Sequence, residues 1–301
     1  MHTGDELPLL TLEEWRETKD TLHLFLQILG KVRLAAAPPQ NHWWHIAYRV
    51  SARGLAYGRM HHSGVDFDAE VDVVDHRVVF RTAHEVRTVP LHDGLSVADF
   101  YIQVMAALAE LGIDMAIRAE PFGVPMTTPF PDDVEHASYD AEAESRYFSV
   151  LSFLDRVLGE FAGWYAGKAS PVHVFWHSFD LAYSRFSGRP APDMDGVDPV
   201  TAEAYSHEVF SFGFWAGDDA LPYAALYSYT APEPDGLTEQ PLLPKGAEWL
   251  HRDSGSLAVF PYAAVRTAAD PRAAALDFFQ SAYAAAARTA RLDQVEMASS
   301  A

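Results

Sequence analysis

The run from Val65 to Val73 limits the fold most strongly, because apolar and acidic residues alternate along it with a period of two. Such alternation predicts a strand with one buried and one solvated face. Asp75-His76 then predicts a turn, and the chain from Arg77 to Thr82 returns as an antiparallel partner, with Arg77 and Arg81 placed to offset the acidic row. A straight strand cannot wrap its carboxylates around one cation, so the acidic row indicates a solvated face rather than a metal site.

Four segments carry apolar residues at helical spacing. They cover residues 11–37, 96–112, about 140–166 and 270–286. At the start of the first segment, Thr11 and Glu14 fit a capping box, in which each side chain bonds a backbone N–H of the first turn. Pro38 must end that helix, because proline can neither donate the helical hydrogen bond nor fit against the preceding turn.

Strand patterns gather between these helices instead of alternating with them one to one. Besides 65–82, they cover residues 44–50, 113–117, one or two strands within 170–190, and 205–215, 224–230 and 257–260. This order predicts an α+β fold, mainly antiparallel sheet with long helices packed on it, and leaves open two similar halves. A proline-rich connection at 121–138 separates a helix–sheet–helix unit, 1–120, from a second unit, 139–301, and the two can also pack as one body.

Composition excludes several classes of protein. The chain has no cysteine, so disulfides and thiolate metal sites cannot form. Its formal net charge of −20 repels phosphate backbones and anionic lipid, so neither nucleic acid nor a membrane is an expected partner. No apolar run is long enough to cross a bilayer, and residues 1–6 lack the features of a signal peptide. We expect a cytoplasmic protein, and its oligomeric state stays open.

Three segments combine large aromatic residues with histidine and other polar residues. They are Ser170–Pro190, Asn41–His45 and Tyr205–Glu208, and the rest of the chain is expected to bring them together. Aromatic walls with a few convergent polar groups are typical of small-ligand sites. The candidate catalytic residues are His173, His207, Glu208 and Asp180, and the candidate ligand-binding residues are His45, His42, Trp44, Trp176, Arg185 and Tyr205.

The histidine spacing does not favour a metal site. His173 and His177 are four residues apart, about 13 Å on a strand, which is too far for one ion. Zinc or iron would need one ligand from each of the three segments, and no spaced metal motif supports this. We therefore predict no metal ligand and a protein that is stable without metal. The chain also lacks a glycine-rich phosphate loop, a nucleophile elbow and kinase motifs, which argues against common nucleotide-dependent classes and leaves any cofactor unknown.

Each candidate residue also has a structural interpretation. Trp43 and Trp44 fit a core, and a buried histidine beside them more often hydrogen-bonds a backbone carbonyl than performs catalysis. Asp180 and Arg185, five residues apart, fit a structural ion pair or a turn cap.

Seven stretches together carry a resemblance to a known family. They are Leu7–Leu34, Asn41–His45, Ser96–Tyr101, Ser170–Pro192, Ala204–Glu208, Phe214–Gly217 and Pro261–Arg266. These stretches are spread over nearly the whole chain, and in them it resembles DUF5996, a bacterial family of uncharacterised function. The resemblance implies no reaction. Members of the family more often have Phe-Trp-Gly where this chain has Phe175-Trp176-His177, which argues against an essential role for His177.

The sequence thus favours an enzyme that acts on a small molecule in a pocket of histidine, acidic and aromatic residues, with a non-catalytic ligand-binding or interaction protein as the alternative. A buried imidazole without a hydrogen-bond partner lowers the stability of the fold. Histidines that line one solvated pocket avoid this loss, because water or a ligand can bond each ring. On this argument we expect His45, His173 and His207 to approach one another and His177 to lie apart from them.

Overall fold

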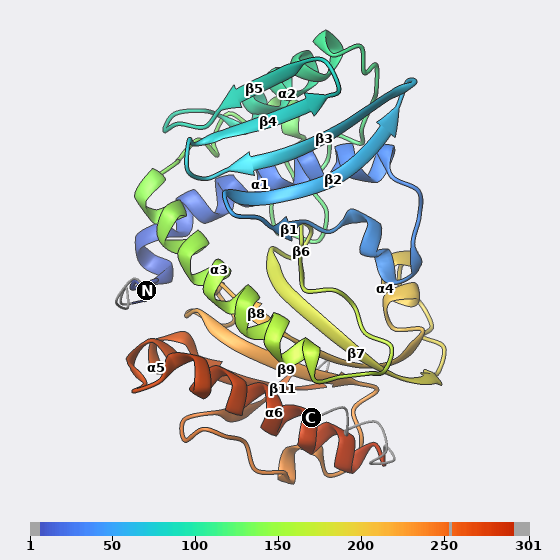
Figure 1. The fold of residues 1–301 in the computed structure, drawn as a ribbon, viewed down its shortest axis with the longest axis vertical. Helices are drawn as coiled ribbons and strands as arrows, with labels where there is room; N and C mark the ends of the chain where they lie inside the picture. Colours follow the sequence, from blue (N-terminus) through green and yellow to red (C-terminus); the bar gives the residue numbers. More distant parts are fainter. Residues whose placement is uncertain (1–6, 253–254, 292–301) are drawn as a thin grey trace.

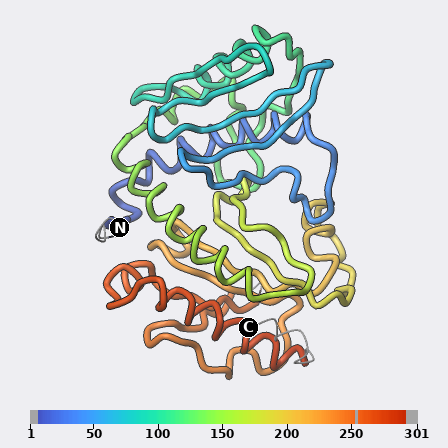
Figure 2. Tube along the Cα trace, in the orientation of Figure 1, coloured from blue at the N-terminus to red at the C-terminus, as the bar shows by residue number. Residues whose placement is uncertain are grey.

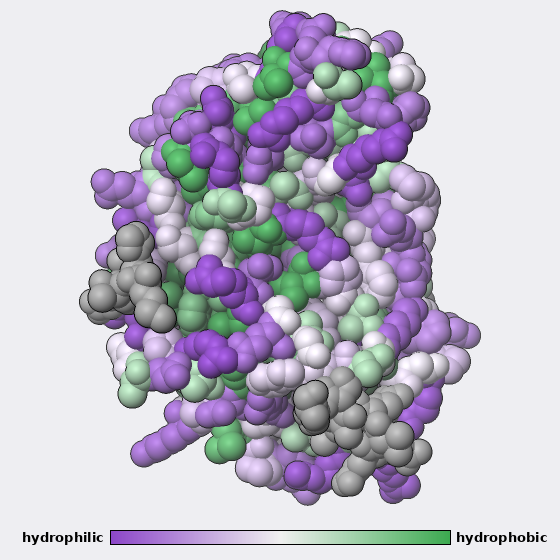
Figure 3. Space-filling model, in the orientation of Figure 1, coloured by the Kyte–Doolittle hydropathy of each residue, from purple (hydrophilic) through white to green (hydrophobic). Residues whose placement is uncertain are grey.

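The protein consists of two antiparallel sheets and several long helices, in a computed structural model that describes residues 7–252 and 255–291 (Figure 1). This arrangement confirms the α+β fold expected from the sequence. Figure 2 traces the chain from the upper sheet, built by the first half, to the lower sheet, built by the second. On the face seen in Figure 3 hydrophilic residues predominate and hydrophobic ones form separate small areas.

The first sheet has five strands that lie in sequence order. They are β1 (Arg49–Val50), β2 (Gly54–His62), β3 (Val65–Asp72), β4 (Arg77–Thr82) and β5 (Val86–Pro90). The predicted hairpin is the pair β3–β4, and its acidic row meets arginines across the ladder as expected. Arg81 donates to both Asp68 and Glu70, at 3.1 and 2.7 Å, while Arg77 bonds Asp75.

The second sheet has six strands in the order β10-β11-β9-β8-β7-β6. Their bounds are β6 (His173–Phe175), β7 (Asp180–Pro190), β8 (His207–Trp215), β9 (Ala225–Ala231), β10 (Glu248–Arg252) and β11 (Gly255–Pro261). Tyr48 and Val174 exchange two backbone hydrogen bonds of 2.8 and 2.9 Å, which join the short strands β1 and β6 and so connect the two sheets.

The helices are α1 (Leu12–Ala36), α2 (Val97–Glu110), α3 (Ala141–Gly163), α4 (Pro199–Ala204), α5 (Tyr262–Thr267) and α6 (Pro271–Thr289), with short 3-10 turns η1 (Asn41–Ile46), η2 (Phe130–Asp132) and η3 (Leu237–Glu239). Helix α1 runs between the sheets, and α3 crosses in front of the lower one (Figure 1). Residues of both sheets and of α1, α2, α3 and α6 form one continuous hydrophobic core. Among the described residues no helix is long and apolar enough to cross a membrane.

Several local predictions were wrong. Thr11 is the N-cap of α1 but its side chain makes no capping bond, so the capping box does not form. Residues 44–50 form η1 and the two-residue β1 rather than one strand, because His42 and Trp43 take left-handed backbone conformations, with φ of 55° and 59°. Residues 113–117 form no strand, although Ile113 is buried.

Candidate functional site

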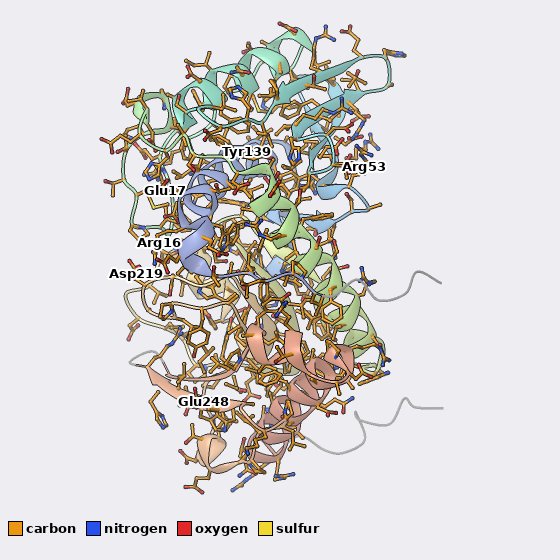
Figure 4. The ribbon with its side chains drawn as sticks, turned by 90° about the vertical axis from the view of Figure 1, so that its left-hand side faces the viewer. Arg16, Glu17, Arg53, Tyr139, Asp219 and Glu248 are labelled. Carbon is orange, nitrogen blue, oxygen red and sulfur yellow. The ribbon has the colours of Figure 1, made fainter. Side chains whose placement is uncertain are left out.

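A cleft of about 620 Å³ lies at the N-terminal end of α1, a volume in the range of small-ligand sites. Its lining comes from residues 12–18 of α1, from Ser138 and Asp140 before α3, and from Pro222 in the loop between β8 and β9. Arg16 and Asp219 of that loop form an exposed ion pair of 2.7 Å, and Figure 4 shows them with Glu17 at the same edge of the molecule. Glutamates outnumber the single arginine in the lining, so its rim is acidic.

A second, much smaller cavity follows one turn further along α1. Lys19 and His23 line it together with Ser178, Phe179 and the segment Trp215–Gly217. Its volume of about 10 Å³ is enough for about one water molecule. The loop after β8 borders both spaces, since it supplies Gly217 to the cavity and Pro222 to the cleft.

A layer of aromatic rings separates the cleft from this inner cavity. The Trp15 ring lines the cleft, and its centroid lies 6.4 Å from that of Phe179, which lines the cavity. Tyr147 of α3 stacks on Trp15 at 4.7 Å and its hydroxyl is buried with no hydrogen-bond partner among the described residues. The Phe179 ring also stacks on His23 at 5.2 Å. These rings fix the position of the turn that follows β6.

The carboxylate of Asp180 lies directly behind the cavity wall. It is 9% exposed and accepts hydrogen bonds from the hydroxyls of Ser178 and Tyr227, which satisfy one oxygen each. Burial, and then the charge of Asp180, raises the pKa of Tyr227 well above its ordinary value, so this phenol stays a donor. Ser178 therefore presents to the cavity a hydroxyl whose proton is already directed toward a carboxylate.

His23 is a neutral imidazole at the same cavity. Burial, assisted by the charge of Lys19, lowers its pKa to about 4. Nε2 lies 3.0 Å from the carbonyl oxygen of Trp176. Because a carbonyl only accepts, Nε2 carries the ring proton and Nδ1 is the acceptor of this tautomer. Lys19 is 8% exposed, and its Nζ pairs with Asp20 at 3.0 Å.

The turn that presents these groups is strained. Phe179 has a φ of 59°, a left-handed conformation that costs a bulky residue about 1–2 kcal/mol. Beside it, Nδ1 of His177 is buried without a hydrogen-bond partner among the described residues. Burial lowers the pKa of His177, while the nearby charge of Asp180 acts in the opposite direction. Backbone strain and unpaired buried polar atoms concentrate at functional sites more than elsewhere.

The three histidine-rich segments do meet, at a place separate from this cavity. The ring of His42 lies 4.5 Å from Phe186, 5.3 Å from Trp44 and 5.8 Å from His207, measured between centroids. Burial, and then the charge of Lys168, lowers the pKa of His42. The structure thus brings His42 to His207.

His45 and His173 make contacts of their own. Nδ1 of His45 accepts the backbone N–H of Gln40 at 3.1 Å, and its ring packs against Trp43. Nδ1 of His173 donates to the carbonyl oxygen of Pro171 at 2.8 Å. Burial lowers the pKa of His173 to about 3, and the nearest ring to it is that of Phe175, at 4.3 Å. In the described part of the chain neither ring contacts His207.

The remaining predicted residues have structural contacts. Arg185 is buried among aromatic rings, 3.8 Å from the centroid of Phe161, and its guanidinium donates to the Phe161 carbonyl near the C-terminal end of α3. It forms no ion pair with Asp180, because residues five apart on β7 point to opposite faces. The Trp176 ring fills the space over Gly30 of α1. Glu208 accepts from Arg189 at 2.6 Å, and Tyr205, the C-cap residue of α4, donates to Tyr229 at 3.2 Å.

Sequence reasoning named Asp180 but missed most of its surroundings. Lys19 and His23, four residues apart, fall on the buried face of a helix whose other buried residues are mostly apolar, and that contrast was a usable signal. Ser178 lay inside the segment from Ser170 to Pro190, whereas Tyr227 stands in an ordinary strand pattern that gave no hint of its bond to Asp180.

In the described residues, no group of three or more histidine or acidic side chains is arranged to hold a metal ion. Comparison with protein families finds one match, the family of unknown function DUF5996, over residues 7–299. No match to the chain was found among curated proteins or among solved structures.

Proposed function

The chain belongs to the DUF5996 family of unknown function, and we propose that it is an enzyme acting on a small polar molecule that enters the cleft and reaches the inner cavity. One observation carries this proposal. Side chains able to exchange protons, Lys19 and His23 of α1 and Ser178 of the β6–β7 turn, line a single cavity beside a cleft of ligand size.

The chemistry follows from the hydrogen bonds. Asp180 can accept the Ser178 proton while Ser178 takes one from a bound hydroxyl or amine, so the pair acts as a general base. Nδ1 of neutral His23 can accept a second donor of the substrate. The Lys19 ammonium group can stabilise negative charge that develops on the substrate, since a buried charge acts in a medium of low polarity.

Access requires the loop after β8 to move. The inner cavity holds only about one water as it stands, and the segment Trp215–Gly217 forms part of its wall. The loop is tied to α1 by the Arg16–Asp219 pair, whose side chains are 41% and 92% exposed. Such exposed pairs contribute at most about 1 kcal/mol, so opening the loop costs little at this contact.

The test is a comparison of purified variants in a mixture of small metabolites, with compound loss followed by mass spectrometry. We expect the wild type to deplete one compound, and Asp180→Asn and His23→Gln to deplete it at least about 100-fold more slowly, the loss typical for an acid–base group. Asp133→Asn is the matched control, because Asp133 is also a buried carboxylate, accepting the backbone N–H groups of Glu135 and His136.

A compound that raises the melting temperature but is recovered unchanged would instead support the non-catalytic ligand-binding alternative. Equal depletion by wild type and Asp180→Asn would refute the assigned role of this carboxylate.

A further inference from the structure

A line of buried hydroxyl groups crosses the second sheet behind Asp180. It begins with Tyr227 of β9, whose phenol donates to the second oxygen of Asp180. The Tyr227 ring can lie flat across β8 only because residue 213 is glycine, since a Cβ there would be 2.6 Å from the phenol oxygen. Tyr229, two residues further on the same strand, points to the same face and stacks on Tyr227 with centroids 6.2 Å apart.

Ser211 of β8 lies on the same face of the sheet as the two phenols. It is directly opposite Tyr229 in the ladder and is 2% exposed. Its hydroxyl accepts that of Ser184 at 3.3 Å and is close enough to both phenols to lower their pKa. Burial raises the pKa of each phenol well above its ordinary value, and the nearby Ser211 hydroxyl acts in the opposite direction. Both phenols therefore stay protonated at neutral pH.

The line ends at Tyr205, the half-buried C-cap residue of α4, which comes just before the first residue of β8. Its hydroxyl donates to that of Tyr229 at 3.2 Å. The bonds whose donors are assigned, Tyr205 to Tyr229 and Tyr227 to Asp180, both run inward toward the carboxylate. The line thus extends from Tyr205, which is near solvent, to the Asp180 oxygen that accepts from Tyr227. The other Asp180 oxygen accepts from Ser178.

We propose that Tyr227, Ser211, Tyr229 and Tyr205 form a proton relay that exchanges protons between Asp180 and water while the cleft is occupied. The inference rests on the proposed function, because a base enclosed under its substrate must recover its starting protonation state by another route.

Each transfer conserves charge and atoms. Tyr227 gives its proton to the Asp180 carboxylate and takes one from Ser211, Ser211 takes one from Tyr229, Tyr229 takes one from Tyr205, and Tyr205 takes one from water, which leaves as hydroxide. The reverse sequence exports a proton from the carboxylic acid. The four hydroxyl residues act through Asp180 and are positioning residues rather than catalytic ones.

The relay can be tested without a ligand, by following the hydroxyl proton between Tyr227 and Asp180 with NMR and measuring its exchange with water by saturation transfer. In Tyr229→Phe, which keeps the ring and removes the hydroxyl, we expect exchange to slow by about tenfold or more, because it then requires local opening of the sheet. Ser211→Ala should have the same effect.

Two controls isolate the relay. Tyr262→Phe removes a buried phenol that donates to the Pro8 carbonyl outside the line, and Ser178→Ala cuts the route through the cavity. Neither should change the exchange rate. An unchanged rate in Tyr229→Phe, or an equal slowing in Tyr262→Phe, would overturn the relay. Slowed exchange in Tyr229→Phe together with full turnover by Asp180→Asn would refute the proposed function while leaving the relay in place.

Discussion

Acid should destabilise this protein through two histidines that are buried in neutral form. The pKa of His23 is about 4 and that of His173 about 3 in the folded protein, against about 6.5 in an unfolded chain. Between pH 6.5 and 4 the unfolded chain therefore binds a proton at each ring that the folded protein does not. Their contribution to stability is complete above pH 6.5 and is lost as the pH falls through this window.

The magnitude follows from the proton count. One proton taken up only on unfolding changes the free energy of unfolding by about 1.4 kcal/mol per pH unit. The two rings together therefore change it by about 3 kcal/mol per pH unit. Over the whole interval from pH 6.5 to 4, the titration of each ring lowers the free energy of unfolding by about 3 kcal/mol. Since a folded domain is stable by about 5–15 kcal/mol in total, this loss is a large fraction of the stability.

Urea denaturation at pH 7, 6, 5 and 4.5 measures this dependence. His23→Gln keeps an N–H for the Trp176 carbonyl, and His173→Asn keeps one for the Pro171 carbonyl, so each variant removes the titration but not the bond. Each should reduce the slope by about 1.4 kcal/mol per pH unit. A wild-type slope retained in both buried variants would refute the reasoning.

Three further outcomes are expected. Gly30→Ala should lower the free energy of unfolding by about 2–3 kcal/mol, because the new Cβ would lie 2.2 Å from Trp176; urea denaturation of a variant as stable as wild type would contradict this. Arg185→Lys should cost about 2–4 kcal/mol, since lysine cannot match the planar guanidinium among five aromatic rings, and an unchanged melting temperature would speak against it. Arg16→Ala should cost less than about 1 kcal/mol in the same denaturation experiment, and a larger loss would show that its pair with Asp219 is not a weak surface contact.

The elements that could be predicted are those whose pattern is local. The β3–β4 hairpin has strict alternation with a turn between its strands, and α2 begins at the Ser96 cap, whose side chain accepts from the Asp99 backbone. Strand β2 was not predicted, because its register shifts between Tyr57 and Met60 and this shift breaks the alternation of period two. Strand β5 was missed because its five residues show only one buried side chain, Val89.

The site depended on information that no local pattern contains. Of the two left-handed residues of η1, Trp43 is of a type that rarely takes that conformation, and tertiary contacts of His42 and Trp44 with Phe186 accompany the turn. His173 was expected in a shared pocket because it stands beside aromatic residues. A backbone carbonyl two residues away satisfies its N–H instead, a contact that depends on how the chain folds back before β6.

The same turn explains which part of the site can move. The strained backbone of Phe179 is held because its ring, 3% exposed, packs against Trp15, His23 and Tyr147, and burying such a ring contributes about 1.5–3 kcal/mol, enough to offset the strain. Ser178 and Asp180 on either side of it are therefore fixed in place by the core. In the loop after β8, Asp219 at the tip is exposed, and Leu221 packs inward, at 3% exposure. If the proposed function holds, substrate entry should depend on movement of that loop, while Ser178 and Asp180 keep their geometry.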